Sequence, residues 1–119
     1  MNQSKSILMD KSFEFALQII KTYKSLIADH KEYEMARQLL KSGTSIGANI
    51  REARNGESRL DFIHKLSISQ KECDETLYWL DLLHMSDYLN EPSYIILKHQ
   101  ATELLKMLRS TIITAKKKI

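Results

Sequence analysis

The chain contains very few residues that interrupt helices, with three glycines and one proline among its 119 residues. A sequence with so little turn punctuation favours long helices joined by short loops. A chain of this length has the usual size of one domain, and it can bury a single core without disulfides or metal. The sequence therefore predicts one all-α domain that covers residues 1–119.

Apolar residues recur at steps of three and four along four segments, which is the spacing of one face of a helix. Phe15 and Ile19 follow this spacing in the first segment, and Leu66, Cys73 and Leu80 repeat every seven residues in the third. Because the breaks between the segments are short, we expect an up-down-up-down antiparallel four-helix bundle. The predicted helices span about residues 11–28, 30–54, 59–85 and 91–116.

Polar residues at the first two helix starts have the character of N-caps. Asp10 or Ser12 would cap the first helix, because their side-chain oxygens can accept from the first free N–H groups. Asp29 is followed three residues later by Glu32, which is the pattern of a capping box. The second helix is therefore predicted to begin directly after Asp29.

The two later breaks contain the other turn residues. Gly56 follows Asn55 and would end the second helix in the left-handed conformation that glycine adopts without strain. Ser58 would cap the third helix. Pro92, two residues after Asn90, is tolerated in the first turn of the fourth helix.

The second predicted helix is poor in bulky side chains. Gly43 and Gly47 each cost about 1 kcal/mol relative to alanine inside a helix, and close packing would offset that cost. Asn49 lies beside the apolar stripe. Its amide either is buried and fixes the helix register or a subunit contact, or it contacts a ligand. Trp79, outside the main seam of the third helix, either covers a neighbouring helix or anchors a subunit interface, and we favour the interface.

The charges alternate along the chain although the net charge is only +3. Residues 37–65 carry six basic against three acidic groups, residues 71–91 carry one against six, and residues 92–119 carry six against one. Basic faces of this kind are either solvated surface or sites for nucleic-acid phosphates. The candidate nucleic-acid-binding residues are Arg37, Lys41, Arg51, Arg54, Arg59, Lys98, Lys106, Arg109 and Lys116.

No set of residues predicts catalysis, a cofactor or a metal site. Asp61/His64 and Asp81/His84 have the spacing of ligand pairs, but both lie on one predicted helix about 30 Å apart and cannot converge. Cys73 lies in the apolar seam and is predicted to be a reduced, buried thiol. With no run of about 18 apolar residues and no secretory leader pattern, we expect a cytoplasmic protein that does not bind membranes.

The central half of the chain resembles the bacterial four-helix bundle proteins named after the intervening sequences of 23S rRNA genes. The resemblance rests on LLKSGTSIGANIREA at 39–53, on GESRLDFIHKLSISQKECDETLYWLDLL at 56–83 and on the ending ELLKMLRSTIITAKKK. It covers roughly residues 12–118. Ala53 departs from the pattern, because many members carry glycine there.

The resemblance implies a four-helix bundle and an assembly that composition did not predict. Relatives, including the accessory variability proteins of diversity-generating retroelements, form pentameric barrels. Those accessory proteins bind nucleic acid and a reverse transcriptase through basic surfaces, whereas most other members have no established activity. We therefore expect a non-enzymatic homo-oligomer, a pentamer by resemblance, that serves as a nucleic-acid-associated scaffold or adaptor for RNA or DNA. The alternative is a protein–protein interaction module that binds a protein partner and no nucleic acid.

Overall fold

The computed structural model describes residues 3–119, with the side chains of residues 7–119, and the first two residues of the predicted domain lie outside that range. Within it the chain forms four helices and no strands, and the molecule measures 47 × 21 × 19 Å. The fold predicted from the sequence is confirmed. The helices are α1 (Gln3–His30), α2 (Glu34–Arg54), α3 (Arg59–Met85) and α4 (Glu91–Lys116).

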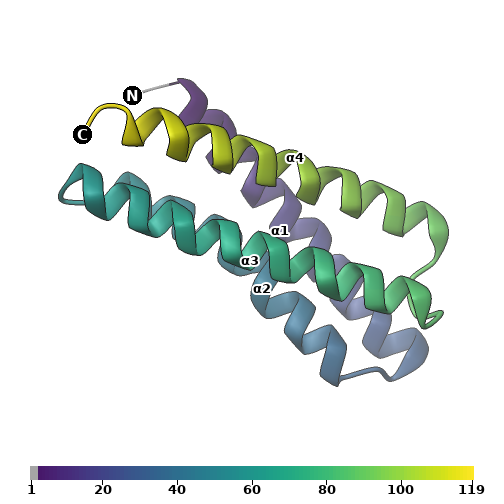
Figure 1. Ribbon diagram of the computed structural model, residues 1–119. Coiled ribbons are helices and arrows are strands. Elements are labelled where there is room, and N and C mark those ends of the chain that lie inside the picture. Colours follow the sequence, from purple (N-terminus) through teal and green to yellow (C-terminus); the bar gives the residue numbers. More distant parts are fainter. Residues whose placement is uncertain (1–2) are drawn as a thin grey trace.

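The four helices pack as a closed bundle of antiparallel neighbours (Figure 1). Helix α1 contacts α2 and α4, and α3 also contacts α2 and α4, so α2 and α4 occupy diagonal corners. The α2–α3 loop lies at the same end of the bundle as the beginning of α1 and the end of α4, on the left in Figure 1. The α1–α2 and α3–α4 loops lie at the opposite end.

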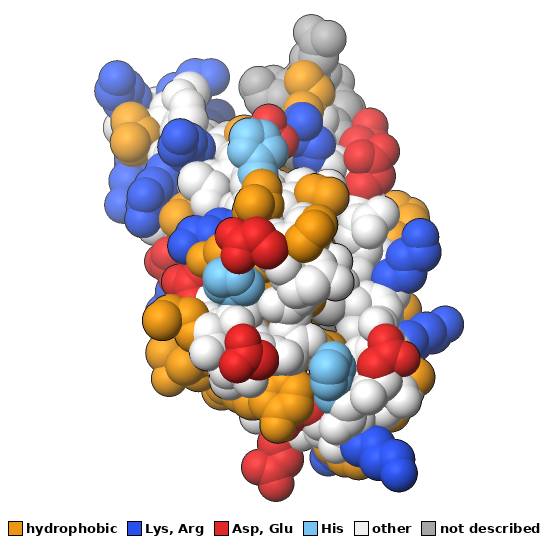
Figure 2. Space-filling view, turned by 90° about the vertical axis from the view of Figure 1, so that its right-hand side faces the viewer, with side chains coloured by type: hydrophobic (Ala, Val, Ile, Leu, Met, Phe, Trp, Pro, Cys, Tyr) orange, Lys and Arg blue, Asp and Glu red, His pale blue; other side chains and the backbone are white. Residues whose placement is uncertain are grey.

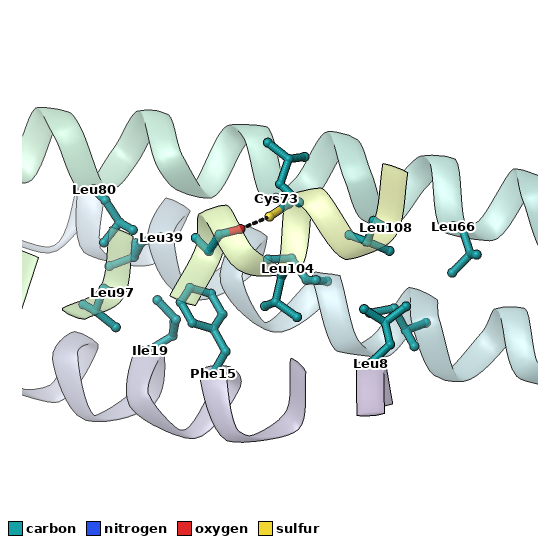
Figure 3. Packing of buried hydrophobic residues seen from close by; sticks show 14 of the residues in the cluster. Leu8, Phe15, Ile19, Leu39, Leu66, Cys73, Leu80, Leu97, Leu104 and Leu108 are labelled. Carbon is teal, nitrogen blue, oxygen red and sulfur yellow. Dashed lines mark hydrogen bonds between the residues drawn. The ribbon is translucent and has the colours of Figure 1, made fainter. Parts of the chain in front are cut away.

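One hydrophobic core draws on all four helices. Figure 3 shows Phe15 and Ile19 of α1 extending into the space that they share with Leu39 of α2 and Leu104 of α4. These four side chains are at most 1% exposed. Each buried side chain of this size contributes roughly 1.5–3 kcal/mol relative to its exposed state, so burial of the four apolar stripes is the main stabilising term.

Helix α1 is longer than predicted at both ends. It begins at Gln3, eight residues before the expected start, and ends at His30. Asp10 and Ser12 therefore lie inside the helix, and neither can be its N-cap. Ser12 is buried, and its hydroxyl donates to the carbonyl of Met9 in the preceding turn. This local bond lets a polar residue occupy a helix interior.

Helix α2 begins at Glu34, so the predicted start at residue 30 was wrong. Asp29 still belongs to α1 and accepts from the Ser25 hydroxyl. The chain leaves α1 through Lys31, which has a left-handed φ of 53°. The Glu32 carboxylate then accepts from the N–H of Ala36, at 2.9 Å, and satisfies one of the free donors of α2.

The starts of α3 and α4 agree with the predicted starts at residues 59 and 91, and the predicted cap at Ser58 forms together with a second cap at Asn90. Ser58 Oγ accepts from the N–H of Asp61, and Asn90 Oδ1 accepts from the N–H of Ser93. Gly56, in contrast, does not have a positive φ, so its predicted left-handed role was wrong. Its need is for space, since a Cβ there would lie 3.0 Å from Asp61 Oδ2 and 3.1 Å from the Ala53 carbonyl oxygen.

The two glycines of α2 face α1. A Cβ on Gly43 would lie 2.8 Å from Cγ1 of Ile19, and one on Gly47 would lie 3.2 Å from Oγ of Ser12. On the neighbouring side of α2, hydrogen bonds connect the helix to α3. Thr76 donates to Ser42 Oγ at 3.0 Å, and Ser69 donates to the main-chain oxygen of residue 46 at 2.8 Å.

Replacing Gly43 with alanine should destabilise the bundle more than the same change at Gly47. At Gly43 the new methyl group must displace buried Ile19, and overpacking of this kind costs about 1–3 kcal/mol. At Gly47 the nearest atom is a hydroxyl at 3.2 Å, and alanine gains about 1 kcal/mol of helix propensity. Urea unfolding would measure both, and equal stability of the two variants would contradict this account.

Candidate nucleic-acid interface

Three of the candidate cations form a row on the outer side of α2. Arg37, Lys41 and Arg51, which we call the α2 row, are all exposed. They fall within roughly 80° of helical arc and span roughly 21 Å along the axis. None of them forms an ion pair within the described residues, where Lys11, Lys65, His84 and Lys98 do. The α2 row is therefore exposed positive charge without ion pairs, and Glu72 of α3 is an acidic group whose charge interacts with that of Lys41.

A second group of candidates lies on α4. Lys106, Arg109 and Lys116, which we call the α4 row, are exposed and likewise have no ion pair among the described residues. Since α2 and α4 occupy diagonal corners, the two rows do not merge into one surface along the bundle. Figure 2 views the side of the bundle that carries the α1–α2 and α3–α4 loops, and on that face histidine and some acidic side chains lie near the centre, while Lys and Arg side chains lie at the upper left and along the right-hand and lower edges.

Lys98 is held differently from the other candidates. Its ammonium group donates to Asp81 Oδ1 at 3.0 Å and to the Tyr94 hydroxyl at 2.8 Å. The same Asp81 oxygen accepts from the Tyr94 hydroxyl at 2.6 Å. The structure thus gives Lys98 a carboxylate partner on α3, and its charge is compensated within the bundle.

The pKa of Asp81 reflects this arrangement. Partial desolvation raises the pKa, but the hydrogen bonds from Tyr94 and Lys98 and the charge of Lys98 outweigh it and hold the pKa below 3.8. The hydrogen bond with Tyr94 and the one with Asp81 raise the pKa of Lys98 above 10.5. Both groups are therefore charged at neutral pH, and the pair fastens the beginning of α4 to the end of α3.

His84 completes the contacts between these two helix ends. Its ring stacks on Tyr94 with centroids 3.9 Å apart, and its Nε2 lies 2.7 Å from Glu91 Oε2. Asp81 and His84 have the spacing of a ligand pair, for which no metal site was predicted, and their cluster with Tyr94 was not predicted from the sequence. The sequence does contain a signal for this cluster. The loop between α3 and α4 is short, so α4 runs back along α3 and places Tyr94, one turn after Asn90, beside the end of α3.

The structural candidates occupy the following positions. Asn49 is half-buried, and its Nδ2 donates to the Ser45 carbonyl within α2. Trp79 packs against the core cluster, and its Nε1 donates to Glu75 at 3.2 Å. The neighbouring Tyr78 meets the Trp79 ring edge-on and is 57% exposed. The exposed aromatic surface at this level of α3 therefore belongs to Tyr78.

Cys73 is buried, as predicted, and its thiol donates to the Ala101 carbonyl at 3.1 Å across the α3–α4 contact (Figure 3). Burial raises the pKa of the Cys73 thiol to about 12, with Asp74 adding to the effect. Such a thiol is not a nucleophile at neutral pH. Among residues 3–119, no three His, Cys, Asp or Glu side chains come together as a possible metal site.

The cations of the α2–α3 end meet at a hollow. Arg54 from the last turn of α2, Arg59 from the first turn of α3 and Lys118 after α4 line a cavity of about 490 Å³. Arg54 also places Nη1 3.5 Å from Met9 Sδ. None of the described helices combines the length and apolar character that a bilayer crossing requires.

Comparison with known proteins identifies the family of the chain and several solved structures that resemble it. The family model described as 23S rRNA-intervening sequence protein matches residues 4–110. A crystal structure from Bacteroides thetaiotaomicron, described as a protein with unknown function from the S23 ribosomal protein family, is 47% identical to the chain, with a TM-score of 0.91. The match covers 92% of this chain and 98% of that one. No curated protein matches the chain.

Replacing Asp81 with asparagine should lower stability by about 0.2–1 kcal/mol at neutral pH, the range of exposed ion pairs, since both partners are nearly half exposed. The folded pKa lies below 3.8, so the stabilisation is present above that pH and is lost as the pH falls through the lowered pKa. Wild type and variant should therefore converge in acid. Unfolding free energies from pH 6 to 2 would test this, and a constant difference would contradict it.

Proposed function

The chain belongs to the 23S rRNA-intervening sequence protein family, and we propose that it is a non-enzymatic, oligomeric scaffold that binds RNA or DNA through phosphate contacts. The observation that carries the proposal is the α2 row, in which three exposed cations share one side of a helix without an ion-pair partner among the described residues. Counterion release from a nucleic acid is the energetic gain that such a row offers.

The α2 row fits a phosphate backbone better than a base-reading site. Phosphate contacts position a protein on a strand but carry no sequence information. On the outer side of α2, Thr44 and Ala48 lie between the cations. The row contains no aromatic side chain on which a base could stack. Binding along this helix is therefore sequence-independent. The α4 row offers a second site on the diagonal corner, and Lys98 takes no part because it is paired with Asp81.

Assembly into a homo-oligomer is the second part of the proposal. Phe13 and Leu17 lie one turn apart on the side of α1 that is turned away from the core, and they are 57% and 51% exposed. Adjacent exposed apolar side chains are the anchors that a subunit contact covers. Oligomerisation would repeat the α2 row and raise the affinity for long strands by avidity. A pentamer is the assembly that the family resemblance implies.

We place the protein in the cytoplasm, where nucleic acid is available and where the lone, buried thiol of Cys73 stays reduced. The competing function is a protein–protein module, which the exposed apolar residues of α1 would also serve. The two functions differ in whether the intact oligomer binds a nucleic acid at low salt.

Reversing the α2 row with Arg37→Glu, Lys41→Glu and Arg51→Glu should weaken binding to RNA and duplex DNA of any sequence. Each lost phosphate contact should reduce the slope of log K against log salt by about 0.7 for a single strand or 0.9 for a duplex. Filter binding or fluorescence anisotropy across a salt series would measure this.

The matched control reverses three exposed lysines elsewhere, with Lys21→Glu, Lys24→Glu and Lys71→Glu, and it changes the net charge by the same amount. It should retain most of the affinity. If both variants lose affinity equally, net charge rather than the α2 row drives binding. No measurable binding of a long mixed-sequence RNA or DNA by the unaltered protein at low salt would reject the scaffold in favour of the protein–protein module.

Replacing Phe13 and Leu17 together with serine should shift the oligomer toward the 13.9 kDa protomer without loss of helix content. Both side chains are more than half exposed in the protomer, so its core does not depend on them. Light scattering with circular dichroism would measure mass and fold together. Leu60→Ser, at a position that is 67% exposed on α3, serves as the control. An unaltered protein that is already monomeric would refute the oligomer.

A further inference from the structure

The hollow at the α2–α3 end of the bundle is lined by two small, buried residues. Ala53, in the last turn of α2, and Ala115, in the last turn of α4, form its floor and are 2% and 4% exposed. Larger side chains at either position would extend into the space. The α2–α3 loop closes one side of the hollow, which has a volume of about 490 Å³. This volume lies within the roughly 300–1,000 Å³ of small-molecule pockets.

The charges around this hollow come from three segments that are separate in the sequence. Arg54, Arg59 and Lys118 supply three positive charges against one carboxylate, Glu57. None of the three cations has an ion-pair partner within the described residues. Helix α3 begins at Arg59 and directs the positive end of its dipole toward the hollow, whereas α2 and α4 end there and direct their negative ends toward it, so the positive potential comes from the three side chains.

Hydroxyl groups complete the lining. Ser110 and Thr114 lie one turn apart on α4 at the edge of the hollow, and both are exposed. Hydroxyl, guanidinium and ammonium groups around an apolar floor match a ligand that carries a phosphate and a less polar body. A phosphate alone would fill only a small part of the volume.

Two other hollows of the same bundle have the opposite charge. The neighbouring one is lined by Glu52, Glu57 and Asp61 against a single cation, Lys65. The one at the far end of the bundle contains Asp29 and Asp87 against Lys21. Of these three hollows, the one above Ala53 and Ala115 alone has an excess of positive charge. Among these three hollows, a preference for an anion is therefore specific to the one above Ala53 and Ala115.

We propose that this hollow binds a nucleoside 5′-phosphate, with Arg59, Lys118 and Arg54 around the phosphate and the two alanines beneath the nucleoside. The ligand is either a free mononucleotide or the phosphorylated 5′ end of a strand, which share this chemistry. The site is separate from the α2 row and does not depend on binding along that row.

Titration calorimetry with AMP at low salt tests the site, with adenosine and inorganic phosphate as the two halves of the ligand. AMP should saturate one site per protomer, adenosine should not bind, and phosphate should bind more weakly than AMP. The double variant Arg59→Ala, Lys118→Ala should lose roughly tenfold or more in AMP affinity, as expected for charge-assisted hydrogen bonds. Both positions are exposed at helix or chain ends, so the fold should persist.

Two further variants separate the site from general electrostatics. Thr114→Phe fills the hollow without changing charge and should abolish AMP binding. Lys24→Ala, Lys71→Ala removes the same charge from other faces and should leave AMP affinity unchanged. No saturable AMP binding, equal binding of adenosine, or full affinity in the Arg59→Ala, Lys118→Ala variant would each overturn the proposal.

Competition identifies the source of the phosphate. A short RNA with a 5′-phosphate that displaces AMP, when its 5′-hydroxyl counterpart does not, assigns the site to strand ends. Failure of both to displace AMP assigns it to free nucleotides. Retained AMP binding in a protein that does not bind long RNA would uphold the nucleotide site and reject the scaffold function, so the two proposals fail independently.

Discussion

The contact between Gly43 and Ile19 sets the geometry on which the rest of the bundle depends. Ile19 occupies the space that a Cβ at residue 43 would need, so α1 lies closer to α2 than any other residue at position 43 would allow. The same approach brings Ser12 against Gly47, one turn further along α2. The side of α2 that carries Gly43 and Gly47 packs against α1, and the side that carries Ser42 packs against α3. The charged residues of α2 can therefore lie only on the outside. The exposed α2 row is thus a consequence of how tightly the inner side packs.

The later half of the fold could be predicted closely because its local signals agree with its packing. Ser58 and Asn90 cap α3 and α4 with their side chains, and the apolar seam starts directly after each cap. The start of α1 was missed because Ser12 looks like a cap but bonds to the turn before it. The start of α2 was missed because Lys31 takes a left-handed conformation and moves the capping role from Asp29 to Glu32.

The candidate site was harder to predict because it depends on which charges meet after packing. Lys98 and Arg109 look alike in the sequence, yet Lys98 faces Asp81 on α3 and Arg109 has no acidic partner among the described residues. The hollow was not predicted at all. It needs Ala53 and Ala115, which are 62 residues apart, to meet at one end of the bundle. Spacing along a single helix contains no information about that register.

The position of Cys73 makes its thiol a probe of how often α3 and α4 separate. The thiol is fully buried between α3 and α4 and bonded to the Ala101 carbonyl, so a labelling reagent reaches it only after these two helices separate. The rate of labelling in native buffer therefore follows the frequency of that separation, as amide exchange does for a backbone group. Since the chain has no other cysteine, the signal comes from one known depth in the core, and a ligand that tightens the bundle would slow it.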